Sequence, residues 1–281
     1  MSEPLVLDGR VVAKWVEADL QKRVAVIKEK SGVTPVLATI IVGNNPASET
    51  YVRMKGNACK RVGMEPKKVE LPETTTTEEL LSVIEELNND DSVCGILLQH
   101  PVPKHIDEQK CFNEISLDKD TDGVNTASFG AVTMGNKGFK CATPYSIMTI
   151  LDYYKIELKG KHAVVIGRSP ILGKPVSMLL LNADATVTIC HSRTQNLPEI
   201  VKTADIVVAC VGKANFVKRD WLKEGVVLVD AGYNEGNVGD IDLQNAAEIS
   251  SAYTPVPGGV GPCTIAMLMR QTVESAERKY L

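Results

Sequence analysis

Short apolar runs alternate with amphipathic segments through the first half of the chain. The run VLATIIV at 36–42 is rich in β-branched residues and ends at the turn signal GNNP, as expected for a buried strand. Threonines at 74–77 precede an acidic turn and predict the N-terminal cap of a helix. Because helices separate the strands, the pattern favours parallel βαβ units. The predicted strands are 36–42, 68–71 and 95–98, and the predicted helices are 11–30, 48–62 and 78–87.

The alternation becomes more regular after about residue 140. Strands there recur about every 20 residues and are followed by glycine-containing turns, a pattern typical of a doubly wound nucleotide-binding domain. The last segment, 264–280, is amphipathic, and we expect it to form a helix that packs back on the first domain. The predicted strands are 161–166, 185–190, 205–210 and 226–230, with helices from 143 to about 154 and from about 175 to 181.

These elements predict two α/β domains, the C-terminal one a Rossmann-type doubly wound parallel sheet. The first domain is expected to be discontinuous, comprising 1–142 and 264–281, and the second to comprise 143–263. The length of 281 residues agrees with two domains at roughly 100 to 200 residues each.

Composition places the chain among globular proteins, since 44% of its residues are hydrophobic and 23% are charged. The formal charge is −4, from 31 Lys and Arg against 35 Asp and Glu. A weakly acidic protein has no general attraction for a polyphosphate backbone, so nucleic acid is not expected as a partner. No apolar stretch approaches the roughly 18 residues of a membrane span, so no membrane partner is expected, and the N-terminus does not look like a signal peptide.

The seven cysteines are scattered and form no C-x-x-C pair. Their odd number and spacing favour reduced, mostly buried thiols and a cytoplasmic location. The four histidines do not combine with cysteine in the spacing of zinc ligands, so no metal site is predicted.

A candidate phosphate-binding turn follows the strand at 161–166. Gly167 permits a tight turn, Gly173 allows close approach of the next helix, and Pro175 suits a first helical turn. The unpaired N–H groups of that helix N-terminus would attract an anion. The spacing GRSxxxG differs from GxGxxG, so local sequence agrees equally well with an ordinary βα turn.

The residues after the next strand favour NADP over NAD. An NAD-binding domain typically has Asp or Glu there to hold the ribose 2′-hydroxyl, whereas this chain has CHSRT at 190–194. Ser192 and Arg193 could donate to a 2′-phosphate, and Arg168 could reach it from the first turn. The alternative for Arg193 is a solvated surface charge.

Tyr51 and Lys55 share one face of the helix predicted at 48–62. A lysine partly buried in a cleft can act as acid or base because burial lowers its pKa. Taken alone, the pair is more often a surface lysine that covers an aromatic ring. Gln99 follows the strand at 95–98, at a strand end where α/β sites form, although it could be a satisfied loop amide.

Two further segments contain candidate ligand-binding residues. In KDTDG at 119–123, Asp122 could accept two N–H donors from a planar heterocycle, or it could cap an Asx turn. The sequence TPVPGGVGP at 254–262 is stiff but sterically open, so its glycines would allow close approach to a ligand. A plain interdomain hinge is the alternative.

The order of these motifs resembles that of the bifunctional methylenetetrahydrofolate dehydrogenase/cyclohydrolase family, of FolD type. The resemblance covers essentially the whole chain. It rests on SxxYVxxK at 48–55, Gln99 with xPxP after it, KDxDG at 119–123, GRSxxxGxP at 167–175, HSRT at 191–194 and PVPGGVGP at 255–262.

The resemblance implies two consecutive reactions. NADP⁺ takes a hydride from 5,10-methylenetetrahydrofolate to give 5,10-methenyltetrahydrofolate, and water then opens this cation to 10-formyltetrahydrofolate. The first domain would bind the folate, the second would bind NADP, and the active site would lie in a cleft between them. A homodimer through the nucleotide domain is also implied.

The resemblance further assigns roles to individual residues. Lys55 would move protons during hydration, with Gln99 hydrogen-bonded to it. Tyr51 would orient the folate, and Asp122 would hold the N–H edge of the pterin. The matching cofactor positions are Gly167, Arg168, Ser169, Ser192 and Tyr233, to which the charge argument adds Arg193; Pro257, Gly258 and Gly259 would line the folate side of the cleft.

Some positions depart from the family pattern. The segment 141–146 keeps only the Thr-Pro of the common pattern PCTPxG. We expect this segment to begin a helix between the domains, so the difference would affect the geometry of a hinge and not the chemistry. His100 and Val102 replace common leucines, Cys263 replaces methionine, and Tyr233 replaces isoleucine. Tyr233 could therefore alter the affinity for the cofactor.

Three alternatives compete with this interpretation. A shikimate-type dehydrogenase would have a similar sheet, but it leaves Gln99 and the PVPGG loop without explanation. A short-chain dehydrogenase has a Tyr-x-x-x-Lys pair, but its glycine-rich turn precedes that pair, whereas here the turn follows it. A non-catalytic NADP-binding module would have no need of Lys55, Gln99 and Asp122.

Overall fold

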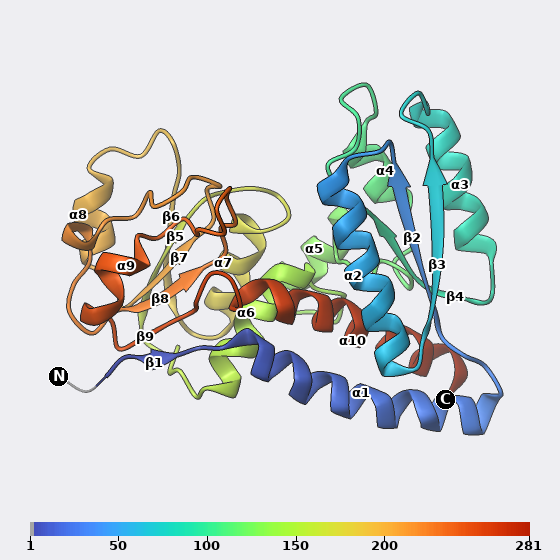
Figure 1. Cartoon of the computed structure of the whole chain (residues 1–281), viewed down its shortest axis with the longest axis horizontal. Coiled ribbons are helices and arrows are strands. Elements are labelled where there is room, and N and C mark those ends of the chain that lie inside the picture. Colours follow the sequence, from blue (N-terminus) through green and yellow to red (C-terminus); the bar gives the residue numbers. More distant parts are fainter. Residues whose placement is uncertain (1–2) are drawn as a thin grey trace. The chain divides into compact units, whose positions relative to one another are not determined.

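The computed structural model describes residues 3–281, which divide into two α/β units (Figure 1). The three-stranded unit comprises residues 15–142 and 265–281. The six-stranded unit comprises the N-terminal residues up to Lys14 together with 143–264. Two helices contribute to both units, because α1 (Gly9–Ser31) and α10 (Val260–Tyr280) each cross a boundary.

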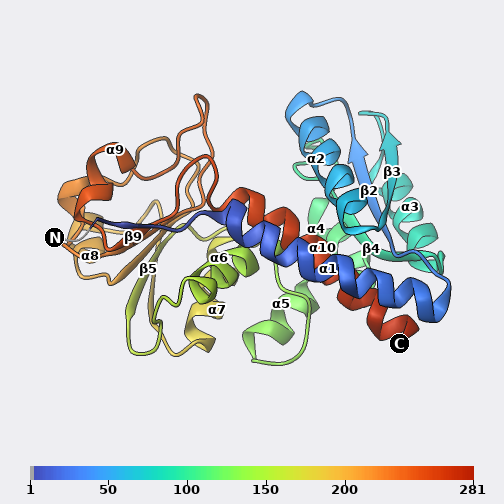
Figure 2. The same ribbon diagram turned by 60° about the horizontal axis from the view of Figure 1, so that its bottom comes forward.

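The three-stranded unit is built on a parallel sheet in the order β3–β2–β4. All residues of the central strand β2 are buried, so both faces of the sheet are covered. Helices α2 and α3 lie on opposite sides of it in both views (Figures 1 and 2). The elements are β2 (Val36–Val42), α2 (Pro46–Val62), β3 (Glu65–Leu71), α3 (Thr77–Asn89), β4 (Val93–Leu98), α4 (Glu108–Glu114) and α5 (Thr126–Thr133).

Helix α3 begins within the threonine run, as predicted. Thr76 is the N-cap residue, and its side chain accepts from the backbone N–H of Glu79 at 3.2 Å. The Glu79 carboxylate in turn accepts from the backbone N–H of Thr76 at 2.8 Å. This reciprocal cap satisfies two of the donors that a helix start leaves without partners.

The six-stranded unit has a parallel sheet in the order β1–β9–β8–β7–β5–β6. Its central strands are apolar and buried, as expected when helices cover both faces of a parallel sheet. The elements are β1 (Leu5–Val6), α6 (Ala142–Tyr153), β5 (His162–Ile166), α7 (Gly173–Asn182), β6 (Thr186–Cys190), α8 (Leu197–Lys202), β7 (Ile206–Ala209), η1 (Arg219–Trp221), β8 (Val227–Asp230), α9 (Leu243–Ala246), η2 (Ala247–Ile249) and β9 (Ala252–Tyr253).

The N-terminal segment belongs to the six-stranded unit, which differs from the predicted domain division. Leu5 pairs with Ala252, so β1 extends the six-stranded sheet, whereas the prediction assigned 1–142 to the other domain. A strand of two residues is too short to produce a periodicity in the sequence. Residues 1 and 2 of that range lie outside the described residues. At the other end of the chain, α10 enters the three-stranded unit at Ile265.

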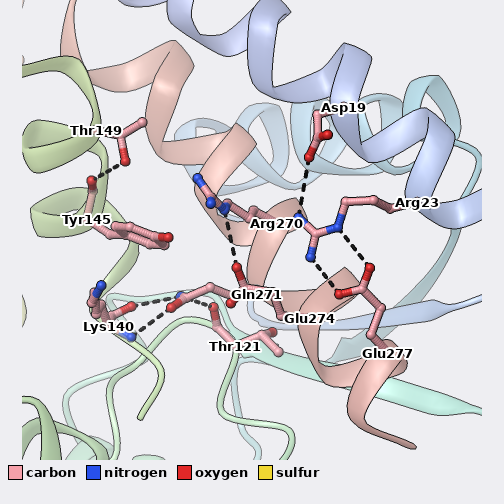
Figure 3. Close-up of polar contacts among 10 residues, drawn as sticks. All are labelled: Asp19, Arg23, Thr121, Lys140, Tyr145, Thr149, Arg270, Gln271, Glu274 and Glu277. Atoms are coloured by element: carbon pink, nitrogen blue, oxygen red, sulfur yellow. Dashed lines mark hydrogen bonds and ion pairs between the residues drawn. The ribbon is translucent and has the colours of Figure 1, made fainter. Parts of the chain in front are cut away.

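An ion pair joins α1 to α10 within the three-stranded unit (Figure 3). The Arg23 guanidinium donates to both carboxylate oxygens of Glu277, at 2.8 and 2.6 Å. The hydrogen bonds to Glu277 raise the pKa of Arg23 above its ordinary value. The two-pronged geometry fixes orientation as well as distance, which suits a contact between two helix surfaces.

The predicted two-domain α/β fold is confirmed, and each predicted helix and strand is present with ends shifted by a few residues. The sequence did not predict β1, β9 or the short helices α4, α5, α8 and α9. No helix among residues 3–281 is long and apolar enough to cross a membrane.

Replacing Gly95 of β4 by alanine should destabilise the three-stranded unit. A Cβ there would lie 2.4 Å from Thr121 Oγ1 and 3.0 Å from Thr272 Oγ1, both fully buried. Overpacking of this kind costs about 1–3 kcal/mol. Urea unfolding measures the loss. The control is Gly130→Ala in α5, where a Cβ meets nothing within 4 Å and stability should not fall. Equal stability of the two variants would contradict the packing argument.

Candidate active site

Lys55 and Gln99 meet at the carboxyl end of β4. The Nζ of Lys55, on α2, donates to Gln99 Oε1 at 2.9 Å. The backbone N–H of Gln99 donates to the Ile40 carbonyl at 2.8 Å, and its Nε2 donates to the His100 carbonyl at 2.7 Å. Gln99 is 8% exposed, and these bonds fix its Oε1 as the acceptor that faces the lysine.

Asp122 lies close enough to Lys55 for their charges to interact. Burial raises the pKa of the Asp122 carboxyl group, and the positive charges of Lys55 and His100 act in the opposite direction. Burial lowers the pKa of the Lys55 amine, and the charge of Asp122 opposes this. Desolvation therefore favours the neutral amine, which is the form of lysine that can accept a proton.

Buried polar groups fix the segment 119–123 that contains Asp122. Lys119 Nζ donates to three backbone carbonyls at the C-terminal end of α3, at 3.0, 2.8 and 2.7 Å. The Asp120 carboxylate accepts from the backbone N–H groups of Val124 and Asn125, at 3.0 and 3.1 Å. Burial raises the pKa of Asp120 to about 7, against the effect of these donors. The segment is therefore held at both ends by internal bonds.

Gln271 of α10 ties this segment to the chain at Lys140 (Figure 3). Its Oε1 accepts from the Lys140 backbone N–H at 2.7 Å, and its Nε2 donates to the carbonyls of Thr121 and Lys140, both at 2.8 Å. Beside these bonds, the Ala142 N–H donates to the Asp122 carbonyl at 3.2 Å. Gln271 is 1% exposed. Sequence analysis missed it because a single helical glutamine has no distinctive spacing.

Tyr51 lies one helical turn before Lys55 on α2 and is 42% exposed. This exposure leaves aromatic surface on which a planar ligand could stack. The structure thus brings Lys55, Gln99 and Asp122 together and puts Tyr51 on the same helix as the lysine.

In the six-stranded unit, Gly167 directly follows β5 and has a φ of 137°, which only glycine adopts readily. A Cβ there would lie 2.5 Å from both the carbonyl oxygen and the sulfur of Cys210. Cys210 directly follows β7, so the turn after β5 lies against the end of the neighbouring strand.

The N-terminus of α7 differs from the expected open anion site. The Gly173 N–H donates to Ser169 Oγ at 3.4 Å, and the Lys174 N–H donates to the Ser169 carbonyl at 3.1 Å. Pro175 has no N–H to offer. The turn itself therefore occupies the first donors of this helix. An anion held at this turn would be met by the side chain of Arg168, which is exposed.

Ser192 and Arg193 follow β6, the neighbour of β5 at the sheet edge, and both are exposed. A tight turn holds them, because the N–H of Thr194 donates to the His191 carbonyl and the N–H of His191 donates to Thr194 Oγ1, both at 2.9 Å. No carboxylate occurs in 190–194. This end of the sheet can therefore accept a phosphate without repulsion from a neighbouring acid.

Two other predicted segments follow β8 and β9 of the same sheet. Tyr233 is 59% exposed, and its hydroxyl donates to Asn237 in its own loop. The peptide bond before Pro257 is cis. Gly258 and Gly259 are buried, and the Gly258 carbonyl accepts from the Gly9 N–H at 2.9 Å. The loop is less open than the sequence suggested, because the N-terminal segment packs against it.

The described residues thus contain two sets of chemically capable groups. Lys55, Gln99 and Asp122 can hold and move a proton, whereas the strand ends of the six-stranded unit can bind an anion. All seven cysteines are free thiols. Within residues 3–281, no group of three or more His, Cys, Asp or Glu side chains could hold a metal ion.

Two family models match the chain. The catalytic-domain model of tetrahydrofolate dehydrogenase/cyclohydrolase matches residues 7–122, and the NAD(P)-binding-domain model of the same family matches residues 141–280. The chain belongs to the tetrahydrofolate dehydrogenase/cyclohydrolase family. The resemblance carried by the sequence motifs is therefore confirmed.

Full-length relatives agree with this membership. The bifunctional protein FolD of Acinetobacter baumannii is 62% identical over 277 residues, which is 98% of each chain. The crystal structure of the bifunctional FolD enzyme from Campylobacter jejuni has a TM-score of 0.95 at 42% identity and covers 98% of this chain and 99% of that one. The Trypanosoma brucei FolD structure, complexed with NADP cofactor and inhibitor, has a TM-score of 0.95 at 35% identity and covers 99% of both chains.

Membership in the tetrahydrofolate dehydrogenase/cyclohydrolase family confirms the predicted enzyme class and the predicted nicotinamide-dinucleotide-binding domain. The shikimate-type and short-chain dehydrogenase alternatives do not describe this chain. The roles of individual site residues stay predictions.

Gln271→Leu should lower the stability of the three-stranded unit more than a substitution on α10 that removes a single hydrogen bond. Gln271→Leu leaves one backbone N–H and two carbonyls without their partner, and we expect a loss of at least about 2 kcal/mol in urea unfolding. Ser275→Ala is the matched control on α10, since it removes one bond, to the Asp118 carbonyl at 2.7 Å, and should cost about 1 kcal/mol. A smaller loss of stability for Gln271→Leu than for Ser275→Ala would contradict the conclusion that Gln271 ties the 119–123 segment to the chain at Lys140.

Proposed function

We propose that this protein oxidises 5,10-methylenetetrahydrofolate with NADP⁺ and then hydrolyses the 5,10-methenyltetrahydrofolate product to 10-formyltetrahydrofolate. The observation that carries the proposal is the hydrogen bond from Lys55 to Gln99 next to the half-buried Asp122. The family membership of both halves of the chain supports each of the two activities.

Hydration of the methenyl cation needs a group that takes a proton from the attacking water. A neutral lysine amine has two N–H donors and one lone pair. One donor of Lys55 is directed to Gln99 Oε1 at 2.9 Å, which orients the amine. Burial lowers the pKa of Lys55, and a nearby substrate cation would lower it further, so both effects favour the base form of the amine.

Proton balance then assigns Lys55 a second task. Water adds to the methenyl carbon and loses a proton to the amine, which gives a neutral tetrahedral adduct. The bond from that carbon to the ring nitrogen N5 then breaks, and the nitrogen gains a proton that the Lys55 ammonium can return. One further proton leaves from the hydroxyl group as the formyl C=O forms, so the overall reaction releases one proton to solvent.

Asp122 and Tyr51 would hold the folate rather than move protons. A carboxylate accepts paired N–H bonds from the flat edge of a pterin, and the exposed ring of Tyr51 offers a stacking surface. The bonds of Gln271 and Lys119 around the Asp122 segment support this role, since a binding group must be held rigidly to orient its ligand.

Hydride loss from the methylene carbon leaves a cation that both folate nitrogens stabilise, so positioning is the main task of the protein in the first reaction. Bound NADP⁺ supplies the hydride acceptor. The residues fit the 2′-phosphate, because the segment after β6 has Ser192 and Arg193 and no acid. Arg168 could reach the same phosphate from the turn after β5, and the resemblance also assigns Gly167, Ser169 and Tyr233 to the cofactor site.

We further propose that Pro257, Gly258 and Gly259 contact the folate substrate. We also infer a homodimer through the six-stranded unit and a cytoplasmic location. The resemblance supports the first inference, and the seven free thiols support the second.

Lys55→Met should abolish hydration while leaving folate binding intact. Methionine keeps the length and apolar stem of lysine but has no proton to exchange, and loss of a general acid–base group costs on the order of 100- to 10,000-fold in rate. Decay of the methenyl chromophore measures hydrolysis, and the KM for methylenetetrahydrofolate in the NADPH-forming assay reports binding.

Lys60→Met is the control for this variant, since Lys60 is exposed in the last turn of the same helix. It should keep both activities. Hydrolysis by Lys55→Met at the parental rate would show that Lys55 is not the proton-transfer group.

Arg193→Ala should reduce the preference for NADP over NAD. Loss of a guanidinium that donates to the 2′-phosphate should lower kcat/KM for NADP by about tenfold or more and leave the value for NAD nearly unchanged. Lys202→Ala, an exposed charge at the end of α8, is the control and should leave the ratio unaltered. A parental enzyme that prefers NAD would overturn the cofactor proposal.

A further inference from the structure

A fully buried carboxylate lies among the loops at the carboxyl edge of the six-stranded sheet. Asp240 Oδ2 accepts from the backbone N–H groups of Val211 and Gly212, at 2.6 and 2.9 Å. Its Oδ1 accepts from the Lys213 N–H at 2.8 Å and from Asn234 Nδ2 at 3.1 Å. Among the described residues, backbone and amide N–H groups meet this charge, and no lysine or arginine side chain is paired with it.

A second buried carboxylate extends this network. Asp230, the last residue of β8, accepts from the Asp240 N–H at 2.9 Å and from the Gly232 N–H at 2.9 Å. Its own N–H donates to Thr254 Oγ1, just after β9, at 2.8 Å. The packing is tight, because a Cβ on Gly239 would lie 2.0 Å from the Asp230 carboxylate. The two carboxylates thus connect the chain segments that follow β7, β8 and β9.

These segments lie where a dinucleotide is expected to bind. Ligands of parallel α/β sheets bind at the carboxyl ends of the strands. The segment 211–213 continues directly from Cys210, whose carbonyl oxygen and sulfur lie 2.5 Å from where a Cβ on Gly167 would be. Asn234 is adjacent to Tyr233, which is exposed at the same edge. Asp240 therefore holds the segment beside the Gly167 turn and the loop of Tyr233 together.

We propose that Asp240 is a positioning residue of the cofactor site: it shapes the 211–213 segment and the Tyr233 loop for NADP without touching the cofactor. It is 0% exposed and its oxygens are already occupied by four N–H donors, so it acts only through these segments. The inference rests on the proposed function, because it assumes that the protein binds NADP.

The two activities separate this role from a purely structural one, because methenyltetrahydrofolate hydrolysis uses no NADP. Asp240→Asn preserves the shape of the side chain but turns one oxygen into an N–H₂ donor that faces backbone N–H groups. We expect the KM for NADP in the dehydrogenase assay to rise about tenfold or more. Hydrolysis of methenyltetrahydrofolate should stay within about twofold of the parental rate.

Asp205→Asn is the matched control. Asp205 immediately precedes β7 at the opposite end of the strand, and its carboxylate also accepts from a backbone N–H, that of His162, at 2.8 Å. It should leave the KM for NADP unchanged. An unchanged KM for Asp240→Asn, or a parallel decline of both activities in step with thermal stability, would overturn the inference.

A milder variant decides the case if Asp240→Asn does not fold. Asn234→Ala removes the side-chain bond that joins the Tyr233 loop to Asp240 and leaves the three backbone bonds in place. It should give the same selective rise in KM for NADP, smaller in size, and a parental KM would overturn the inference. Absence of NADPH formation by the parental enzyme would instead refute the proposed function, so the two failures are distinguishable.

Discussion

The proposed chemistry depends on a partly buried lysine amine that hydrogen-bonds to a neutral amide oxygen instead of to a carboxylate. Lys55 donates to the neutral oxygen of Gln99, and the half-buried carboxyl group of Asp122 is near enough for the two charges to interact. A direct ion pair would stabilise the ammonium and raise the pKa of the lysine, which would remove its ability to accept a proton. An amide acceptor orients the amine and stabilises its ammonium form less than a carboxylate would. Gln99 therefore matters as much for what it lacks, a negative charge, as for what it bonds.

The two units use the same method to keep carboxylates buried. Asp120 in one unit, and Asp230 and Asp240 in the other, are met by backbone N–H groups rather than by lysine or arginine side chains. Backbone donors fix the path of the chain as they satisfy the charge, so each carboxylate also determines a loop conformation. Burial nevertheless raises the pKa of Asp120 to about 7 and that of Asp230 to about 6. Because these values lie above the pKa of an aspartate in an unfolded chain, both groups contribute stability below about pH 4 that is lost as pH rises through about 6 to 7.

Much of this arrangement could be predicted from the sequence, because it depends on local patterns. Periodicity located the long helices and the buried strands, and the motif around Lys55 and the segment KDTDG pointed to the residues that the structure brings together at β4. Gln271 and Asp240 could not be found in this way, since each acts through backbone groups distant in sequence and belongs to no recognisable spacing. The two-residue strand β1 has the same limitation, because its place in the sheet is set by pairing with β9. The N-terminus of α7 shows the reverse case: its motif was recognised, but Ser169 already occupies the donors that an anion would use.

The two proposed reactions make different demands on the two units. Hydration needs a proton-transfer group and a held pterin, and the groups suited to both tasks, Lys55, Gln99 and Asp122, all belong to the three-stranded unit. Oxidation needs in addition a dinucleotide, and the groups suited to holding it, from the Gly167 turn to the Tyr233 loop, all belong to the six-stranded unit. Changes near β6 or Asp240 can therefore alter cofactor choice or affinity without touching the proton-transfer groups. The two sets are separate because each is held by hydrogen bonds within its own unit. A chain organised in this way can lose or change one activity while the other continues.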